Sequence, residues 1–126
     1  MSTYSILNPG RIVAGAGCIE SIAELVADFG ATQALIVSDE GVARAGLIDR
    51  PKALLETAGV TVAVIDSTPP EPEVGQVEAL LAIAQTQACD LVIGIGGGSA
   101  MDVAKIIAVL LTNKVSLRQL LNKAPI

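Results

Sequence analysis

The chain has 126 residues, a length typical of one domain, and its apolar residues are mostly aliphatic. Hydrophobic residues make up 52% of the sequence and aromatic residues only 2%, so the core is built from Ala, Val, Ile and Leu. Such residues suit parallel strands that helices cover on both faces. The net charge of −5, with no basic run, excludes the electrostatic pattern of a nucleic-acid-binding protein.

The sequence lacks the patterns of a targeting or membrane segment. Residues 1–10 have no basic stretch followed by an apolar one, which a signal peptide requires. The longest apolar candidate, residues 106–111, is far shorter than the ~20 residues that cross a bilayer. Cys18 and Cys89 are far apart and have no metal-binding spacing, so we expect two reduced thiols. We therefore expect a cytoplasmic protein with no membrane partner.

The first half of the chain alternates strand-length apolar runs with helical patterns. Residues 11–17 predict a short strand that enters a glycine turn. Residues 19–29 carry apolar side chains at helical spacing and are followed by a glycine, the usual residue after a helix end. Residues 33–38 form a continuous apolar run that predicts a buried strand, and a second helix is expected over residues 47–58.

The second half repeats this alternation after a proline-rich loop. Strands are predicted over residues 61–66 and 91–95, and helices over 72–87, from Ser99 to about 111, and over 116–122. Four strands that alternate with helices are typical of parallel β-α-β units. The sequence thus predicts a Rossmann-like α/β domain of three layers, with a parallel sheet between helices, over residues 1–126.

A glycine cluster after the last predicted strand has the composition of a phosphate-binding loop. Gly96, Gly97 and Gly98 have no Cβ atoms that would keep a phosphate away from the backbone. Ser99 then opens a helix, whose free N–H groups and partial positive charge favour an anion. Ligands of open parallel sheets lie at the carboxyl ends of strands, where this loop is expected.

A structural interpretation of the same residues stays open. Ser99 and Asp102 match a capping box, and Asp102 and Lys105 have the spacing of a surface ion pair. The glycines can also form a tight turn. The cluster departs from the usual dinucleotide fingerprint because Ser99 replaces the third glycine and because the glycines follow the fourth predicted strand.

The segment from Gly96 to Lys105 resembles the GGGSxxDxxK motif of iron-containing (group III) alcohol dehydrogenases. Further similarity to this family is found in the glycine turn at 12–17, the strand at 35–39 that ends in aspartate, and the proline loop at 70–72. Glu71 stands between the two prolines, where many members have Asn. The resemblance extends over essentially the whole chain.

The resemblance implies that the chain binds NAD(H). The cofactor-binding residues that it implies are Asp39, Gly96, Gly97, Gly98, Ser99, Asp102 and Lys105. The glycine loop would line the pyrophosphate, and Asp102 and Lys105 would lie toward the nicotinamide. Asp39 would accept hydrogen bonds from the adenosine ribose and repel the 2′-phosphate of NADP, and the alternative for Asp39 is an ordinary loop aspartate.

The same resemblance implies a longer parent enzyme that moves hydride between an alcohol or aldehyde and the nicotinamide. A second, helical domain of the family supplies an Asp and three His that bind iron or zinc, whereas this sequence contains no histidine. We therefore assign no catalytic residue and no metal ligand here, and we expect the chain alone to be inactive. A homodimer formed through the opening strand is implied by the resemblance alone.

Two other interpretations keep the same architecture. Glycerol dehydrogenases and dehydroquinate synthases have a similar cofactor domain, and the synthases typically have Gly at the position of Lys105. A truncated, non-catalytic binding module is the third interpretation, because the sequence contains no histidine or metal-binding constellation.

Overall fold

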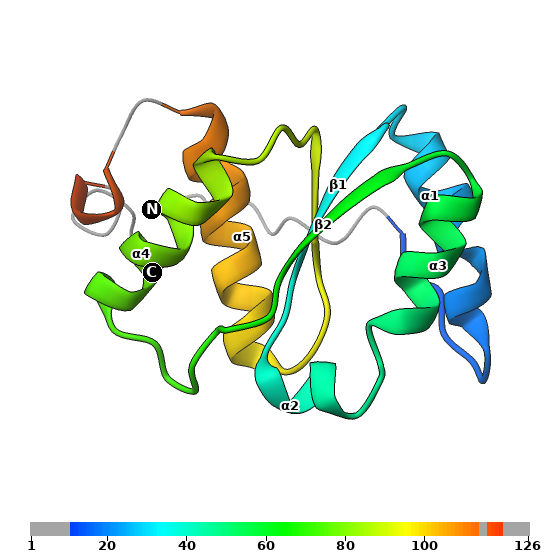
Figure 1. The fold of residues 1–126 in the computed structure, drawn as a ribbon, viewed down its shortest axis with the longest axis horizontal. Coiled ribbons are helices and arrows are strands. Elements are labelled where there is room, and N and C mark those ends of the chain that lie inside the picture. Colours follow the sequence, from blue (N-terminus) through cyan, green and yellow to red (C-terminus); the bar gives the residue numbers. More distant parts are fainter. Residues whose placement is uncertain (1–10, 114–115, 120–126) are drawn as a thin grey trace, which may run out of the picture.

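A parallel sheet of three strands forms the centre of the computed structural model, which describes residues 11–113 and 116–119 (Figure 1). The strands are β1 (Gln33–Val37), β2 (Thr61–Ile65) and β3 (Leu91–Gly94), in the order β2-β1-β3. Leu35 in β1 lies opposite Ala63 of β2 and Val92 of β3. Because β1 has a strand on each side, its residues 34–37 are all buried.

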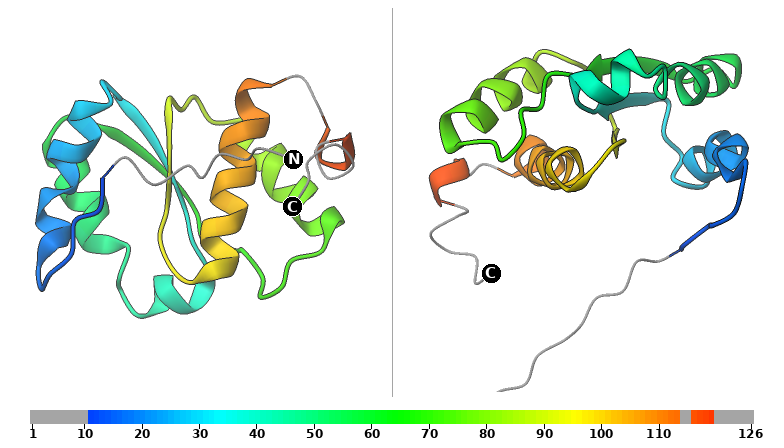
Figure 2. Two further views of the ribbon diagram at one scale, coloured as in Figure 1. Left: turned by 180° about the vertical axis from the view of Figure 1, so that it is seen from behind. Right: turned by 90° about the horizontal axis from the view of Figure 1, so that it is seen from below.

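Helices cover both faces of the sheet, as the predicted three-layer fold requires (Figures 1 and 2). On one side lie α1 (Ile22–Asp28) and α3 (Asp49–Thr57); on the other lie α4 (Val74–Gln85) and α5 (Gly98–Thr112). Two short elements complete the fold: η1 (Cys18–Ser21) before α1, and α2 (Glu40–Arg44) after β1. None of the helices in the described ranges has the length and apolarity needed to cross a membrane.

Alternate residues of β1 point into two separate cores. Leu35 and Val37 pack with Val103 and Ile107 of α5 and with apolar residues of α4. Ala34 belongs to the second core, which α1 and α3 cover. Each fully buried aliphatic side chain of this size stabilises the fold by roughly 1.5–3 kcal/mol. Because β1 is buried on both faces of the sheet, residues 33–38 form a nearly continuous apolar run and not an alternating pattern.

The predicted opening strand at residues 11–17 does not form. Residues 11–14 are irregular, and the chain then turns into η1. A strand requires a neighbour that pairs with its backbone groups, and no strand of the described chain lies next to this segment. Ile12 is accordingly 79% exposed. The glycine cluster therefore follows the third strand and not the fourth.

Most of the other predicted elements form with shorter bounds, whereas α5 extends slightly beyond its predicted range at both ends. The helices expected over residues 19–29, 47–58 and 72–87 correspond to α1, α3 and α4, whereas α2 was not predicted. A capping box lies at the start of α4, where the side chain of Gln76 accepts from the backbone N–H of Glu73 at 2.8 Å and the side chain of Glu73 accepts from the backbone N–H of Gln76. Of the helix expected over residues 116–122, residues 117–119 are helical and 120–122 lie outside the described residues.

Asp90 ties the beginning of β1 to the loop before β3. Its carboxylate accepts hydrogen bonds from the backbone N–H groups of Thr32 and Gln33, each at 3.0 Å. The hydrogen bond from Thr32, followed by that from Gln33, holds the pKa of Asp90 below its ordinary value. The amino ends of the two strands are thus joined by a side chain as well as by the sheet ladder.

Candidate functional site

A pocket of about 610 Å³ lies where the carboxyl ends of the three strands meet. Its walls are residues 39–41 and 44 after β1, residues 67–70 after β2, and residues 97–100 after β3. The chain leaves β1 toward α3 on one face of the sheet and leaves β3 toward α5 on the other face. A crevice opens between such diverging connections, and open α/β sheets bind their ligands there.

Gly97 and Gly98 form the wall of the pocket at the N-terminus of α5. Gly97 is the N-cap of this 15-residue helix, with extended backbone and no side-chain cap. A Cβ atom added to Gly97 or Gly98 would meet no atom within 4 Å, so both positions border open space. The first N–H groups of a helix have no partner within the helix and carry partial positive charge. The wall therefore offers backbone donors to an anion in the pocket.

Gly96 has a steric role beneath the pocket rather than a place in its wall. Its φ is +140°, and an added Cβ would lie 3.2 Å from Oδ2 of Asp39 and 3.3 Å from Cβ of Ala100. A side chain there would push apart the loops that follow β1 and β3. Glycine at this position allows the two loops to approach each other closely.

Asp39 lines the pocket and also begins a helix. Its Oδ1 accepts a hydrogen bond from the backbone N–H of Val42 at 2.8 Å, which makes Asp39 the N-cap of α2. Its Oδ2 lies on the side of Gly96. A carboxylate can accept about four hydrogen bonds, so the cap leaves capacity for a ligand. The structural and the binding interpretations of Asp39 are therefore compatible.

Ser99 lies in the pocket wall but does not cap the helix. It is the second residue of α5, so the predicted capping box with Asp102 is wrong. Its hydroxyl instead accepts a hydrogen bond of 3.3 Å from the backbone N–H of Glu71. This bond fastens the proline loop after β2 to the beginning of α5 and closes the pocket on that side.

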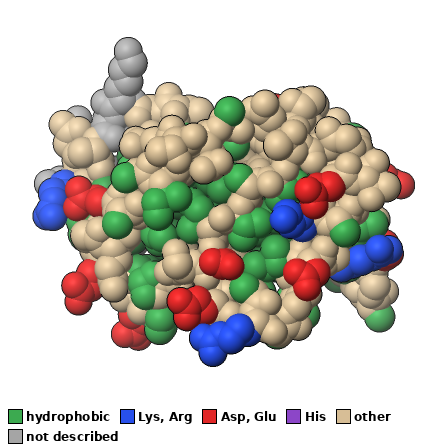
Figure 3. All heavy atoms as spheres, in the orientation of Figure 1, with side chains coloured by type: hydrophobic (Ala, Val, Ile, Leu, Met, Phe, Trp, Pro, Cys, Tyr) green, Lys and Arg blue, Asp and Glu red, His purple; other side chains and the backbone are tan. Residues whose placement is uncertain are grey.

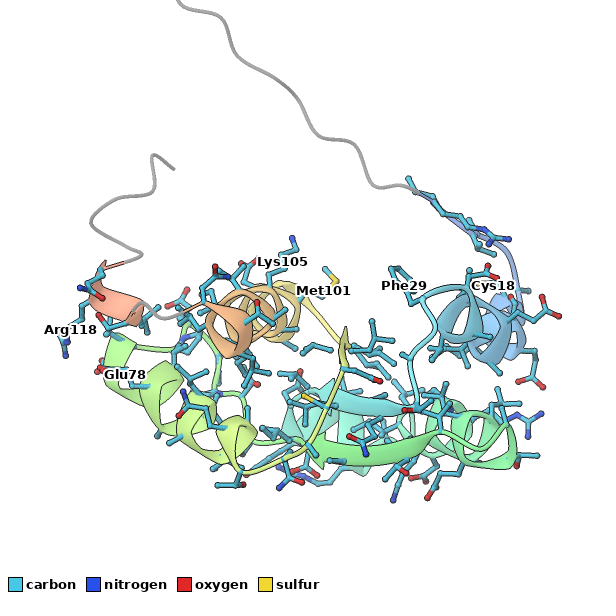
Figure 4. The ribbon with its side chains drawn as sticks, turned by 90° about the horizontal axis from the view of Figure 1, so that it is seen from above. Cys18, Phe29, Glu78, Met101, Lys105 and Arg118 are labelled. Atoms are coloured by element: carbon cyan, nitrogen blue, oxygen red, sulfur yellow. The ribbon has the colours of Figure 1, made fainter. Side chains whose placement is uncertain are left out.

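Asp102 and Lys105 are not brought into the pocket. Their side chains are 75% and 78% exposed, and Oδ1 of Asp102 lies 4.0 Å from Nζ of Lys105. Lys105 projects outward beside Met101 (Figure 4) and borders a shallower groove of about 290 Å³ between α5 and β3. In this chain the pair has the geometry of a weak surface ion pair.

Ser38 joins the loops of the pocket and was missed by the sequence reasoning. This fully buried residue donates its N–H to the carbonyl of Ile65 at 2.7 Å and its hydroxyl to the carbonyl of Ile95 at 2.6 Å. Its own carbonyl accepts the N–H of Thr68 at 3.2 Å. One residue thus holds the ends of all three strands together. The only signal for it in the sequence is a polar residue directly after a buried apolar run.

Thr68 is the second residue that the sequence reasoning missed. It lines the pocket, yet it is only 3% exposed, and its hydroxyl has no hydrogen-bond partner among the described residues. No pattern in the sequence distinguishes it from the other residues of the proline loop.

The charged side chains of the pocket are mainly acidic and come from the segment after β1. Asp39 and Glu40 lie there together with Arg44, whose guanidinium is 3.2 Å from the carboxylate of Glu40. In the space-filling view, acidic and basic side chains gather along the lower edge, around α2 (Figure 3). Within residues 11–113 and 116–119, no group of three or more His, Cys, Asp or Glu side chains is placed to hold a metal ion.

Comparison with known proteins identifies relatives of this chain. Residues 9–126 match the family model for iron-containing alcohol dehydrogenase. Alcohol dehydrogenase 4 of Schizosaccharomyces pombe is 44% identical over 99 residues, which are 79% of this chain and 24% of that protein. Probable NADH-dependent butanol dehydrogenase 1 of Bacillus subtilis is 32% identical over 108 residues, 86% of this chain and 28% of that protein.

Solved structures of longer chains share the fold. An alcohol dehydrogenase from Oenococcus oeni superimposes with a TM-score of 0.84 at 27% identity, over 94% of this chain and 31% of that one. NADH-dependent butanol dehydrogenase A from Thermotoga maritima gives a TM-score of 0.80 at 26% identity, over 92% of this chain and 29% of that one. The chain therefore spans between 24% and 31% of the length of these relatives. Since the family model covers nearly every residue, the chain belongs to the iron-containing alcohol dehydrogenase family.

Proposed function

We propose that the pocket binds NAD(H) and that residues 1–126 are the dinucleotide-binding domain of an iron-type alcohol dehydrogenase. One observation carries this proposal: Gly97 and Gly98 present open backbone at the N-terminus of a 15-residue helix, in the wall of the pocket at the carboxyl ends of the strands. A pyrophosphate suits such a wall because its charge interacts with the helix N-terminus and its oxygens accept from backbone N–H groups. A relative whose name states NADH dependence supports the choice of cofactor.

The remaining pocket residues fit the rest of a dinucleotide. Asp39 would accept hydrogen bonds from the ribose hydroxyls with the lone pairs that the α2 cap leaves free. A 2′-phosphate at the same place would meet the charges of Asp39 and Glu40, so NAD would be favoured over NADP. Gly96 and the hydroxyl of Ser99 would act indirectly, by holding the loops in place. Asp102 and Lys105 would contact only a nicotinamide half that extends beyond the pocket.

The chemistry that NAD+ supplies when bound is acceptance of a hydride from an alcohol carbon, and loss of the hydroxyl proton completes the conversion to an aldehyde or ketone. The residues of this chain would bind and orient the cofactor by its pyrophosphate and adenosine ribose. No residue of the chain is assigned to proton transfer or to the iron or zinc of the parent enzyme, because the described residues form no ligand set. We therefore propose that substrate binding and catalysis need parts of the enzyme outside this sequence.

Calorimetric titration of the purified chain with NAD+ and NADP+ tests this proposal. NAD+ is expected to bind saturably and more tightly than NADP+. Gly97→Val should abolish binding, because the isopropyl group would occupy the open space beside the helix N-terminus while the extended backbone accepts any residue. Gly75→Val is the matched control, since Gly75 also borders open space but lies in α4, away from the pocket.

Asp39→Asn tests the assignment of the ribose. The amide oxygen of Asn still accepts from the N–H of Val42, so α2 keeps its cap while the negative charge is lost. The preference for NAD+ over NADP+ should shrink by about tenfold, which corresponds to about 1.4 kcal/mol. A folded chain that binds neither dinucleotide, or a Gly97→Val variant that binds NAD+ normally, would contradict the proposed function.

A further inference from the structure

We infer that the hydroxyl of Thr68 is a ligand-binding group, placed to bond the adenosine ribose of the dinucleotide; this inference rests on the proposed function. Thr68 lines the pocket, is 3% exposed, and has no hydrogen-bond partner for its Oγ1 among the described residues. No motif of the family resemblance includes it. The inference therefore gives a ligand-binding role to a residue outside both the glycine loop and the aspartate after β1.

The unpaired hydroxyl is a cost to the folded chain. A buried hydroxyl that loses water and gains no partner is less favourable than a methyl group in the same place. Ser38, the other buried polar side chain of the described core, shows the usual outcome, because its hydroxyl donates to the carbonyl of Ile95. Thr68 departs from this rule at a pocket wall, where an incoming ligand can supply the missing partner.

The position of Thr68 is fixed by the loops on both sides. Its backbone N–H donates to the carbonyl of Ser38 at 3.2 Å, which places it beside the residue that precedes Asp39. Three residues further along, the N–H of Glu71 donates to the hydroxyl of Ser99. The segment between these two bonds contains two consecutive prolines, Pro69 and Pro70, whose rings restrict its backbone. Thr68 is therefore held rigidly next to the place assigned to the ribose.

Rotation about one bond can change the direction in which the hydroxyl points. The Cβ of threonine carries one hydroxyl and one methyl group in staggered positions, and a step of about 120° in χ1 exchanges them. The loop does not have to move for this exchange. A threonine hydroxyl both donates and accepts, whereas the carboxylate of Asp39 only accepts. The two side chains are thus complementary toward a ribose diol, whose hydroxyls also do both.

Thr68→Val separates a ligand-binding hydroxyl from a structural one. Valine keeps the shape of the side chain and removes the unpaired group, so the melting temperature of the free chain should rise by about 2–5 °C. The affinities for NAD+ and for AMP, which both contain the adenosine ribose, should fall by about three- to tenfold. Thr68→Ser keeps the hydroxyl and should bind NAD+ and AMP with affinities close to those of the unchanged chain. Thr57→Val, at the exposed end of α3, is the matched control and should change neither quantity.

Thermal unfolding and calorimetry on the same preparations give distinguishable outcomes. If Thr68→Val binds NAD+ and AMP as tightly as the unchanged chain, this inference is wrong and the proposed function stands. If Thr68→Val melts at a lower temperature, the hydroxyl serves the fold and the inference is also wrong. If the unchanged, folded chain binds neither NAD+ nor AMP, the proposed function and this inference fail together.

Discussion

Glu71 holds a backbone conformation that few side chains tolerate. Its φ is +45°, the one positive value among the non-glycine residues described, and it lies between two prolines in the loop beside the pocket. In this left-handed region the Cβ atom crowds the following carbonyl, at a cost of roughly 1–2 kcal/mol for most residues. Asn and Gly adopt it more readily. The family's frequent Asn at this position therefore has a backbone explanation.

Replacement of Glu71 by Asn should stabilise the chain by about 1 kcal/mol, because Asn tolerates positive φ. Chemical denaturation measures this difference. Glu71→Gln is the control, since it also removes the charge but keeps a side chain that is strained at this φ. Equal stabilisation by Asn and Gln would show that the charge, and not the backbone, is responsible.

At the level of single residues, Gly97, Gly98 and Asp39, which the sequence analysis named as cofactor-binding residues, line the pocket. Their binding roles stay predictions. The roles of Ser38 and Thr68 could not be predicted, because both depend on the pairing of β1 with strands distant in the sequence. The carbonyl that accepts from the hydroxyl of Ser38 belongs to Ile95, 57 residues later.

Among the elements, the end of β1 is where the loops of the pocket are joined. Ser38→Ala would leave the carbonyl of Ile95 without its donor and should lower the free energy of unfolding by about 1–2 kcal/mol. NAD+ affinity should fall as well, since the loops after β2 and β3 would no longer be fixed to β1. Urea unfolding and calorimetry test both effects.

Ser21→Ala is the matched control for this change. The hydroxyl of Ser21 donates to the carbonyl of Cys18 at 2.7 Å, but this bond lies in η1, remote from the pocket. A loss of stability without any loss of NAD+ affinity is expected for Ser21→Ala. If Ser38→Ala behaved in the same way, the role of Ser38 as a link between the pocket loops would be refuted.

The stability of the folded chain should depend on pH through Asp90, whose carboxylate joins the amino ends of β1 and β3. Hydrogen bonds from Thr32 and Gln33 lower the pKa of this carboxylate in the folded chain relative to the unfolded chain. Its contribution is therefore complete above the unfolded pKa of about 3.9 and is lost as the pH falls through the lower, folded value.

The Asp90→Asn variant should accordingly have a lower melting temperature than the unchanged chain at pH 7. This difference in melting temperature should narrow as the pH approaches about 3. Thermal unfolding at several pH values measures this difference. Asp66→Asn serves as the control, because the carboxylate of Asp66 accepts no hydrogen bond from the described part of the chain. A difference that stays constant with pH would rule out this account of Asp90.

The elements themselves were predictable where the apolar pattern of the sequence is local. The central strands and long helices carry apolar residues at the spacing of their secondary structure, and β1, β2, β3 and α5 form where predicted. The segment 11–17 has the same local pattern but no partner strand, which sequence periodicity cannot reveal. The five-residue helix α2 depends on the cap from Asp39 more than on an apolar stripe, and none of its residues is buried.

On the scale of the whole molecule, β3 is an open edge with an apolar border. Within the described residues it pairs only with β1, and the groove beside it is lined by Met101, Val92 and Ala108 among others. Met101 and Phe29, which are 45% and 75% exposed, project on the same side of the molecule (Figure 4). Unpaired strand edges with exposed apolar neighbours favour association between chains.

The purified chain should therefore self-associate as its concentration rises, and Met101→Lys should weaken this association by placing a charge beside the edge. Sedimentation velocity over a concentration series measures the effect. Leu47→Lys is the control, because Leu47 is also an exposed apolar residue, at 60%, but follows α2. Equal weakening by both variants would mean that general hydrophobicity, and not the β3 edge, drives the association.

The strand order β2-β1-β3 also determines when the pocket can exist during folding. β2 follows β1 closely in the sequence, whereas β3 must close a loop of more than fifty residues before it pairs. The glycine wall follows β3, so a partly folded chain with only β1 and β2 paired would have no site to offer. A dinucleotide that binds the completed pocket would select the fully paired sheet by mass action and would hold its least enclosed strand in place.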